Sequence, residues 1–278
     1  MNPAAGPDRY AVVGHPVGHS RSPFIHGEYA RATGQSMQYD LLDVPPDRFV
    51  SAVRAFFAAG GRGLNVTVPH KQAAFALVDV LTPRAARAGA VNTLRLRPDG
   101  TLEGDNTDGV GLVTDLEANL GLAIAGTRIL ILGAGGATRG VLGPLLVRGP
   151  AQITIANRTP ARAAELAQSF ADLGAVHGCG YDELGAGPWD LVINATSASL
   201  SGTTPPIAAG VIGTSSVCYD MAYARDETPF TRLARERGAK ATHMGWGMLV
   251  EQAAEAFWLW RGVRPATGAV LDALVHGA

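Results

Sequence analysis

The stretch Arg128–Arg139, RILILGAGGATR, indicates the fold of the chain. Its first five residues, Arg128–Leu132, favour a strand that is buried on both faces, as in a parallel sheet. The glycine-rich turn at 133–136 follows, and residues 137–147 are spaced like a helix. A strand, a glycine turn and a helix present free backbone N–H groups to a phosphate. Because Thr138 replaces the last glycine of G-x-G-x-x-G, a tight turn without a ligand stays an alternative.

The residues after the next predicted strand, 152–156, indicate which dinucleotide the chain binds. An NAD-binding unit usually carries a carboxylate here, which holds the ribose hydroxyls. This chain instead has Asn157, Arg158 and Thr159, followed by Arg162. Two guanidinium groups suit a 2′-phosphate, so the sequence predicts NADP(H) rather than NAD(H).

The composition excludes several classes of protein. The chain has 278 residues, 47% of them hydrophobic, and a formal net charge of −1, so no basic field attracts nucleic acid. Two cysteines make no disulfide framework, and no Cys or His residues stand at metal-ligand spacing. The first ten residues do not resemble a signal peptide, and no apolar run reaches the ~18 residues of a membrane span. We therefore expect a cytoplasmic protein with a small-molecule substrate and no metal, which is a monomer or a homodimer.

Strands and helices are also predicted before the glycine turn. Strands are expected at 10–14, 37–44, 63–68, 90–97 and 101–104, with helices at about 22–33 and 46–59. Ser20 and Ser22 lie at the start of the first helix, where two hydroxyls can bind a carboxylate. Ser22, followed by Pro23, is also expected to be the N-cap.

A polar face ends the strand predicted at 63–68. Asn65 and Thr67 alternate with Val66 and Val68, so the two pairs are expected on opposite faces. Lys71 then falls in the first turn of a helix. A surface lysine is the alternative, but beside Asn65 and Thr67 we favour a functional one.

Further polar groups collect around the hairpin expected at 90–104. Asn92 lies on its first strand, and the segment GDNTDG at 104–109 follows its second. Asp108 alone would be interpreted as a helix cap, but the segment holds more polar groups than capping needs. Gln252 is the one polar residue on the apolar face of a helix expected at 245–260; it either marks the edge of that face or has a function.

From Arg128 onward the predicted strands and helices alternate, which is typical of a doubly wound parallel sheet. The fold class is therefore α/β.

In several separate motifs, from His15 to about Gly262, the chain resembles the shikimate dehydrogenases. The motifs are HSRSP at 19–23, NVTVPHK at 65–71, AVNT at 90–93, GDNTDG at 104–109, GAGGATR at 133–139, NRT at 157–159 with Arg162, NATS at 194–197, DMAY at 220–223 and GMLVEQA at 247–253. The resemblance implies reversible, NADP-dependent reduction of 3-dehydroshikimate to shikimate, a step toward chorismate and the aromatic amino acids.

The resemblance also implies roles for individual residues. Lys71 and Asp108 match the catalytic pair of the family. The residues that match its substrate site are Ser20, Ser22, Asn65, Thr67, Lys71, Asn92, Asp108, Tyr223 and Gln252. The residues that match its cofactor site are Gly133, Ala134, Gly135, Gly136, Ala137, Asn157, Arg158, Thr159, Arg162, Thr196, Met221 and Gly245.

The family's architecture implies two domains with an active-site cleft between them. Residues 1–108 and 246–278 would form an N-terminal α/β substrate domain, and residues 109–245 a Rossmann-like NADP domain. Helices near 109–120 and 246–260 would act as hinges. One departure concerns Ser199, where many members have glycine, which leaves the shape of that loop open.

Two other functions stay open as alternatives. A quinate/shikimate or aminoshikimate dehydrogenase of the same fold would differ in few contacts. A catalytically silent nucleotide-binding regulatory module would be expected to lack Lys71 or Asp108, and both are present.

Overall fold

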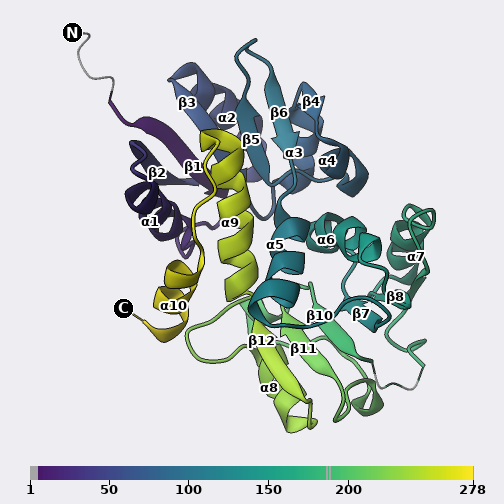
Figure 1. Cartoon of the computed structure of the whole chain (residues 1–278). Coiled ribbons are helices and arrows are strands. Elements are labelled where there is room, and N and C mark those ends of the chain that lie inside the picture. Colours follow the sequence, from purple (N-terminus) through teal and green to yellow (C-terminus); the bar gives the residue numbers. More distant parts are fainter. Residues whose placement is uncertain (1–5, 186, 188, 278) are drawn as a thin grey trace. The chain divides into compact units, whose positions relative to one another are not determined.

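The computed structural model describes residues 6–185, 187 and 189–277, which form two compact units. The first unit comprises the described residues up to Gly111 and from Val250 onward, and the second comprises Leu112–Leu249. The chain enters the second unit within helix α5 (Asp108–Thr114) and leaves it within helix α9 (Trp246–Arg261) (Figure 1). The second unit is therefore an insertion into the first.

The first unit is built on a mixed sheet with the strand order β2-β1-β3-β5-β6-β4. Its strands are β1 (Asp8–Gly14), β2 (Met37–Asp43), β3 (Gly61–Val66), β4 (Val80–Leu81), β5 (Thr93–Leu96) and β6 (Leu102–Asp105). Strand β1 is parallel to β2 and β3, whereas β5 is antiparallel to β3 and β6. The predicted hairpin is thus confirmed as β5 and β6, although β5 is shorter than predicted and β6 is shifted by one residue.

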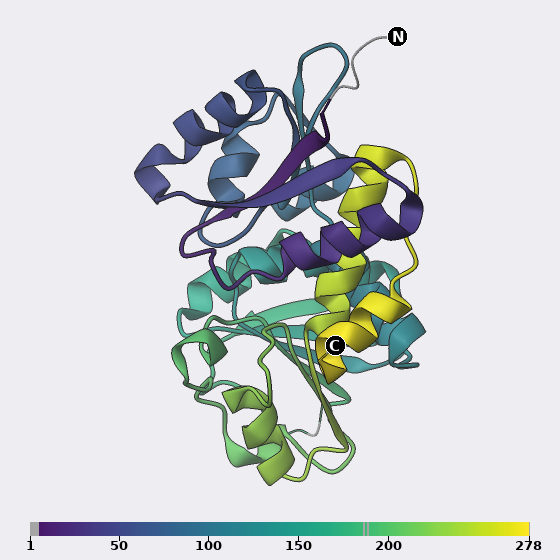
Figure 2. The same cartoon turned by 90° about the vertical axis from the view of Figure 1, so that its left-hand side faces the viewer.

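Helices and buried side chains complete the first unit. Besides the part of α9 that belongs to it, the unit contains α1 (Ser22–Thr33), the 3-10 turn η1 (Pro46–Arg48), α2 (Phe49–Ala58), α3 (Lys71–Leu77), α4 (Pro83–Ala88) and α10 (Gly268–His276). Helix α1 packs against β2 and α2 against β3 (Figure 2). Phe49, Val53 and Leu64 are buried in the core between α2 and the sheet.

Two local predictions for this unit were wrong. The strand predicted at 63–68 ends at Val66, where its pairing with β1 ends, so Val68 does not continue the buried face and is 59% exposed. Ser22 is the first residue of α1 rather than its N-cap; that position belongs to Arg21, whose side chain makes no capping hydrogen bond. The hydroxyl of Ser22 accepts a hydrogen bond from Ser20 instead.

The second unit confirms the predicted doubly wound sheet. Its strands are β7 (Arg128–Leu132), β8 (Gln152–Ala156), β9 (Val176–Cys179), β10 (Leu191–Asn194), β11 (Val217–Asp220) and β12 (Ala241–Met244). They are all parallel and follow the order β12-β11-β10-β7-β8-β9. This order reverses between β7 and β10, the place where such sheets bind dinucleotides.

Helices cover this sheet and close its core. They are η2 (Asp115–Asn119, a π-helical turn that continues α5), α6 (Gly136–Val147), α7 (Pro160–Gln168), α8 (Pro229–Glu236) and the 3-10 turns η3 (Ser199–Ser201) and η4 (Ala209–Val211). The largest buried cluster joins Leu142, Ile153 and Tyr219 with neighbouring apolar side chains.

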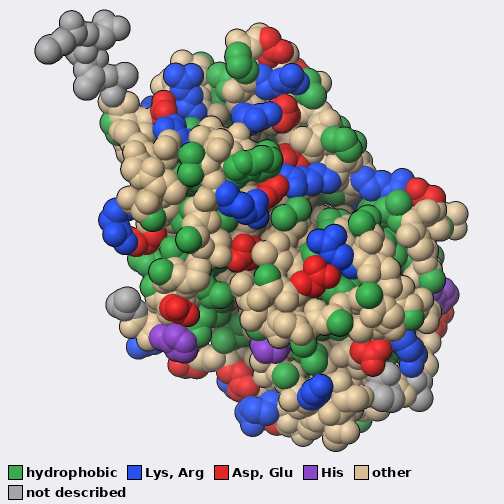
Figure 3. All heavy atoms as spheres, in the orientation of Figure 1, with side chains coloured by type: hydrophobic (Ala, Val, Ile, Leu, Met, Phe, Trp, Pro, Cys, Tyr) green, Lys and Arg blue, Asp and Glu red, His purple; other side chains and the backbone are tan. Residues whose placement is uncertain are grey.

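Basic and acidic side chains are interspersed on the face of the molecule that Figure 3 shows. No helix within the described part of the chain is long and apolar enough to cross a membrane.

Candidate active site

An ion pair between Lys71 and Asp108 lies at the centre of the polar cluster in the first unit. Lys71 is the first residue of α3 and Asp108 the first residue of α5, and their Nζ and Oδ2 atoms are 2.5 Å apart. The side chains are only 18% and 7% exposed. Asp108 is the first helical residue of α5, and its two carboxylate oxygens accept hydrogen bonds from Lys71 and Asn92. A largely buried ammonium held beside a carboxylate can pass a proton to and from a nearby oxygen atom.

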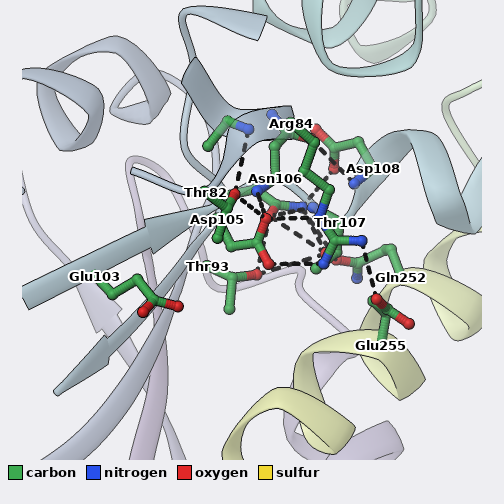
Figure 4. A network of polar contacts seen from close by, with 12 residues as sticks. Thr82, Arg84, Thr93, Glu103, Asp105, Asn106, Thr107, Asp108, Gln252 and Glu255 are labelled. Atoms are coloured by element: carbon green, nitrogen blue, oxygen red, sulfur yellow. Dashed lines mark hydrogen bonds and ion pairs between the residues drawn. The ribbon is translucent and has the colours of Figure 1, made fainter. Parts of the chain in front are cut away.

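Asn92 holds this pair in place. Its Nδ2 donates to Oδ1 of Asp108 over 2.8 Å and contacts Oε1 of Gln252 over 3.4 Å. Asp108 and Gln252 are labelled in Figure 4. Its Oδ1 accepts from the backbone N–H of Thr107 and from the hydroxyl of Thr93, both over 2.9 Å. The amide of Asn92 is buried and fixed at both ends, so it orients one oxygen of Asp108.

Asn65 joins the same cluster through a residue that the sequence did not single out. Its Nδ2 donates to Thr93 over 3.2 Å, and its Oδ1 accepts a 2.6 Å bond from the hydroxyl of Tyr39. Burial raises the pKa of Tyr39 well above its usual value, opposed by a hydrogen bond with Ser22. Tyr39 therefore stays protonated and connects Asn65 with the Ser20–Ser22 pair.

His70, the residue before Lys71, points away from the cluster, because successive residues of a helix lie about 100° apart around its axis. It is 1% exposed, its Nε2 lies 2.7 Å from the carbonyl oxygen of Val44, and its ring lies 4.6 Å from that of Phe49. Of the two neighbours, Lys71 alone faces Asp108.

The remaining two residues that were assigned to the substrate lie outside this hydrogen-bonded cluster. Thr67 follows β3 and is half-buried. Tyr223 belongs to the second unit, where its ring lies 4.4 Å from that of Trp246.

The glycine turn of the second unit leaves the N-terminus of α6 open. Gly135 is the N-cap and Gly136 the first helical residue, and a Cβ at either would meet no atom within 4 Å. Gly133 has a φ of +102°, a conformation that favours glycine. Thr138, which departs from the glycine pattern, donates a 2.7 Å hydrogen bond to the carbonyl oxygen of Gly133 and so closes the turn. This turn fits a phosphate at the helix N-terminus.

Arg158 and Arg162 lie exposed at the start of α7. Neither forms an ion pair with a described residue. Thr159 is the N-cap, although its side chain makes no capping bond, and its carbonyl oxygen accepts from Nδ2 of Asn157. Two cations near a helix N-terminus oppose the helix dipole, so the arrangement favours a bound anion.

Three further residues assigned to the cofactor follow β10, β11 and β12 at the same edge of the sheet, namely Thr196, Met221 and Gly245. The backbone N–H and hydroxyl of Thr196 both donate to Oδ1 of Asn194. Gly245 lies so close to Met221 that a Cβ would come within 2.4 Å of the carbonyl oxygen of Met221. Ala134 and Ala137 are half-buried within and just after the glycine turn.

Ser199 is accommodated in its loop without strain. It begins the 3-10 turn η3 with a negative φ. Its hydroxyl donates to Oδ2 of Asp220 over 2.6 Å and accepts from Nδ2 of Asn194 over 3.3 Å. Burial raises the pKa of Asp220, while hydrogen bonds from Ser199, Thr228 and Ala222 act in the opposite direction.

Among the described residues, no group of three or more His, Cys, Asp or Glu side chains is placed to hold a metal ion.

Three family models match successive parts of the chain. They are the shikimate dehydrogenase substrate binding domain over residues 12–94, shikimate/quinate 5-dehydrogenase over 116–217, and the shikimate 5′-dehydrogenase C-terminal domain over 245–275.

Similar proteins match over nearly their whole length. A shikimate dehydrogenase (NADP(+)) of Methylococcus capsulatus is 59% identical over 268 residues, covering 96% of each chain. One of Aeromonas hydrophila is 58% identical over 267 residues, covering 96% of this chain and 97% of the relative. The crystal structure of shikimate 5-dehydrogenase from Thermus thermophilus in complex with NADP(H) and shikimate has a TM-score of 0.85 at 34% identity, covering 98% of this chain and 100% of that one. The chain belongs to the shikimate dehydrogenase family, as its motifs led us to expect.

Proposed function

We propose that the protein is an NADP-dependent oxidoreductase that interconverts 3-dehydroshikimate and shikimate in the route to chorismate and the aromatic amino acids. The main structural support for the proposal is the buried ion pair between Lys71 and Asp108, which Asn92 holds in place. The membership of the chain in this family supports it as well. In this proposal, the first unit binds the substrate and the second binds NADP(H).

Reduction of a ketone by hydride leaves an alkoxide that must gain a proton. NADP(H), when bound, supplies or takes up the hydride. Lys71 gives a proton to the substrate oxygen during reduction and accepts it during oxidation. Asp108 holds Lys71 through its Oδ2 atom, while its Oδ1 atom accepts a hydrogen bond from Asn92. In this proposal, the same carboxylate also holds the reacting hydroxyl.

The other residues orient the substrate. Ser20 and Ser22 hold its carboxylate at the start of α1. Its remaining hydroxyls contact amide and hydroxyl groups of Asn65, Thr67, Asn92, Tyr223 and Gln252.

The cofactor is held by the edge of the doubly wound sheet. The open turn at Gly133–Ala137 binds the pyrophosphate, and Arg158 and Arg162 bind the 2′-phosphate, with Asn157 and Thr159 beside them. Thr196, Met221 and Gly245 line the rest of the site.

Absorbance at 340 nm after mixing the protein with shikimate and NADP⁺ tests the proposal. Formation of NADPH is expected, and a parallel assay with quinate measures the substrate range. Binding of NADP⁺ without any turnover would favour the silent module instead. The two free thiols, both buried, are consistent with the proposed cytoplasmic location, and light scattering would distinguish a monomer from a homodimer.

A further inference from the structure

Arg84 is the centre of a buried ion-pair network in the first unit (Figure 4). Its Nε and Nη2 atoms donate to the two carboxylate oxygens of Asp105, each over 2.6 Å. Its Nη1 atom donates to Oε1 of Glu255 over 2.9 Å. Arg84 is 27% exposed, whereas Asp105 and Glu255 are only 6% and 8% exposed. One guanidinium group therefore pairs with two buried carboxylates.

The two partners of Arg84 belong to segments that carry site residues. Asp105 ends β6, three residues before Asp108. Glu255 lies on α9, three residues after Gln252 and hence on the same side of that helix. Arg84 thus joins the loop that leads to Asp108 with the helix face that presents Gln252.

The chemistry of this contact requires arginine. A planar guanidinium can bind one carboxylate with two parallel bonds and still donate to another, whereas an ammonium acts as a point charge. Burial alone would raise the pKa of Asp105, but the bonds and charge of Arg84, with the hydroxyl of Thr82, lower it. Asp105 is therefore a buried carboxylate whose charge depends on Arg84. Removing one partner of such a pair leaves an uncompensated buried charge.

We infer that Arg84 is a positioning residue, which fixes the loop before Asp108 and the α9 face at Gln252, and so aligns the Lys71–Asp108 pair with the substrate. This inference rests on the proposed function of that pair. Arg84 itself contacts neither Lys71 nor Asp108 in any hydrogen bond or ion pair of the described residues.

The chain offers a matched control in Arg264. Its Nη1 pairs with the other oxygen of Glu255 over 2.6 Å, but it does not contact Asp105. Arg264→Met therefore removes an ion pair from the same glutamate without releasing the loop. Arg84→Met removes the charge and keeps an unbranched side chain. Arg84→Lys keeps the charge but loses the planar guanidinium that donates to both oxygens of Asp105.

Steady-state kinetics with shikimate and NADP⁺ give the first readout. For Arg84→Met we expect kcat to fall about 10- to 100-fold and the KM for shikimate to rise, because small displacements of reacting groups are that costly. The KM for NADP⁺ should not change, and Arg84→Lys should recover part of kcat. Arg264→Met should stay within about threefold of the wild type, as expected for a partly exposed pair.

Hydrogen exchange gives a second readout that needs no turnover. Backbone amides at 105–109 should exchange faster in Arg84→Met than in the wild type, and those in Arg264→Met should not. A fall in kcat with both KM values unchanged, or exchange equal to that of Arg264→Met, would overturn the inference. If Arg84→Met does not fold, the same comparison is made with Arg84→Lys. A wild type without activity would refute the proposed function, while exchange would still decide whether Arg84 orders the loop.

Discussion

The hydroxyl of Ser199 donates a 2.6 Å hydrogen bond to Oδ2 of Asp220. Ser199 lies in the loop after β10 and Asp220 ends β11, so the bond joins two neighbouring loops at one edge of the sheet. Thr196 and Met221, both assigned to the cofactor, lie within three residues of this bond. Ser199 therefore has a structural role in this chain.

We predict that Ser199→Ala loses about 1.5–3 kcal/mol of unfolding free energy, the usual effect of a hydrogen bond to a charged group. Asp220 keeps its bonds from Thr228, Asn194 and Ala222, so the variant should still fold. The KM for NADP⁺ should rise, because the loop after β10 loses the bond of Ser199 to Asp220.

Urea unfolding and initial rates measure both effects. Ser201→Ala is the control, since its exposed hydroxyl bonds only within the same loop. If Ser199→Ala matched the wild type in stability and in KM, the bond would be unimportant.

Lys71→Ala should lower kcat by ~10²–10⁴-fold, the usual contribution of general acid–base catalysis, with a smaller change in the KM for shikimate. Asp108→Asn should also lose activity, since it no longer balances the charge of Lys71. Initial rates at 340 nm measure these effects.

The neighbouring His70 provides the control. His70→Ala removes the ring that stacks on Phe49 and should lower stability, yet the folded variant should stay active. An inactive His70→Ala with an active Lys71→Ala would show that the proton passes through the histidine.

Arg158→Ala should raise the KM for NADP⁺ and leave that for NAD⁺ nearly unchanged, because only NADP⁺ carries the 2′-phosphate. A charge-assisted bond is worth about 1.5–3 kcal/mol. Arg148→Ala is a suitable control, since that residue is exposed and pairs with Glu117. Equal losses for both cofactors would contradict the assignment of Arg158.

Stability should fall in mild acid because of His26. Its ring is stacked 4.3 Å from that of Tyr39, and burial lowers its pKa to about 3, opposed by the Asn65 side chain. The unfolded chain takes up a proton on His26 below about pH 6.5, whereas the folded chain does not. The stabilising contribution of the neutral ring to the free energy of unfolding is thus fully present above that pH. As the pH falls toward 3, this contribution is lost by up to about 1.4 kcal/mol per pH unit.

His26→Phe keeps a stacked ring without a titratable group, so its unfolding free energy should change less between about pH 7 and pH 5. Urea denaturation at both pH values measures this, and His177→Gln, at an exposed position, should behave like the wild type. An unchanged pH dependence in His26→Phe would assign the effect to other groups.

The sequence predicts features that repeat locally and misses those that depend on distant contacts. The strands Arg128–Leu132 and Gln152–Ala156 were predicted to the residue, because their apolar runs are bounded by turns. Tyr39 and Arg84 were missed because their partners are distant in the sequence. Tyr39 and Asn65 are 26 positions apart, and Arg84 and Glu255 are 171 positions apart, so neither contact leaves a local pattern. Ser22 satisfied the rules for a cap, but its hydroxyl is engaged with Ser20 and Tyr39.

The insertion of the second unit into the first sets the order in which a nascent chain can be completed. Strand β12 ends at Met244, so the doubly wound sheet has all its strands before Val250 is synthesised. The first unit, although it begins the chain, still lacks the C-terminal part of α9, where Trp260 donates to the carbonyl oxygen of Leu94 and Arg261 pairs with Asp8. Domains generally fold as units during translation. On the ribosome, the unit that is started first is therefore the one that is finished last.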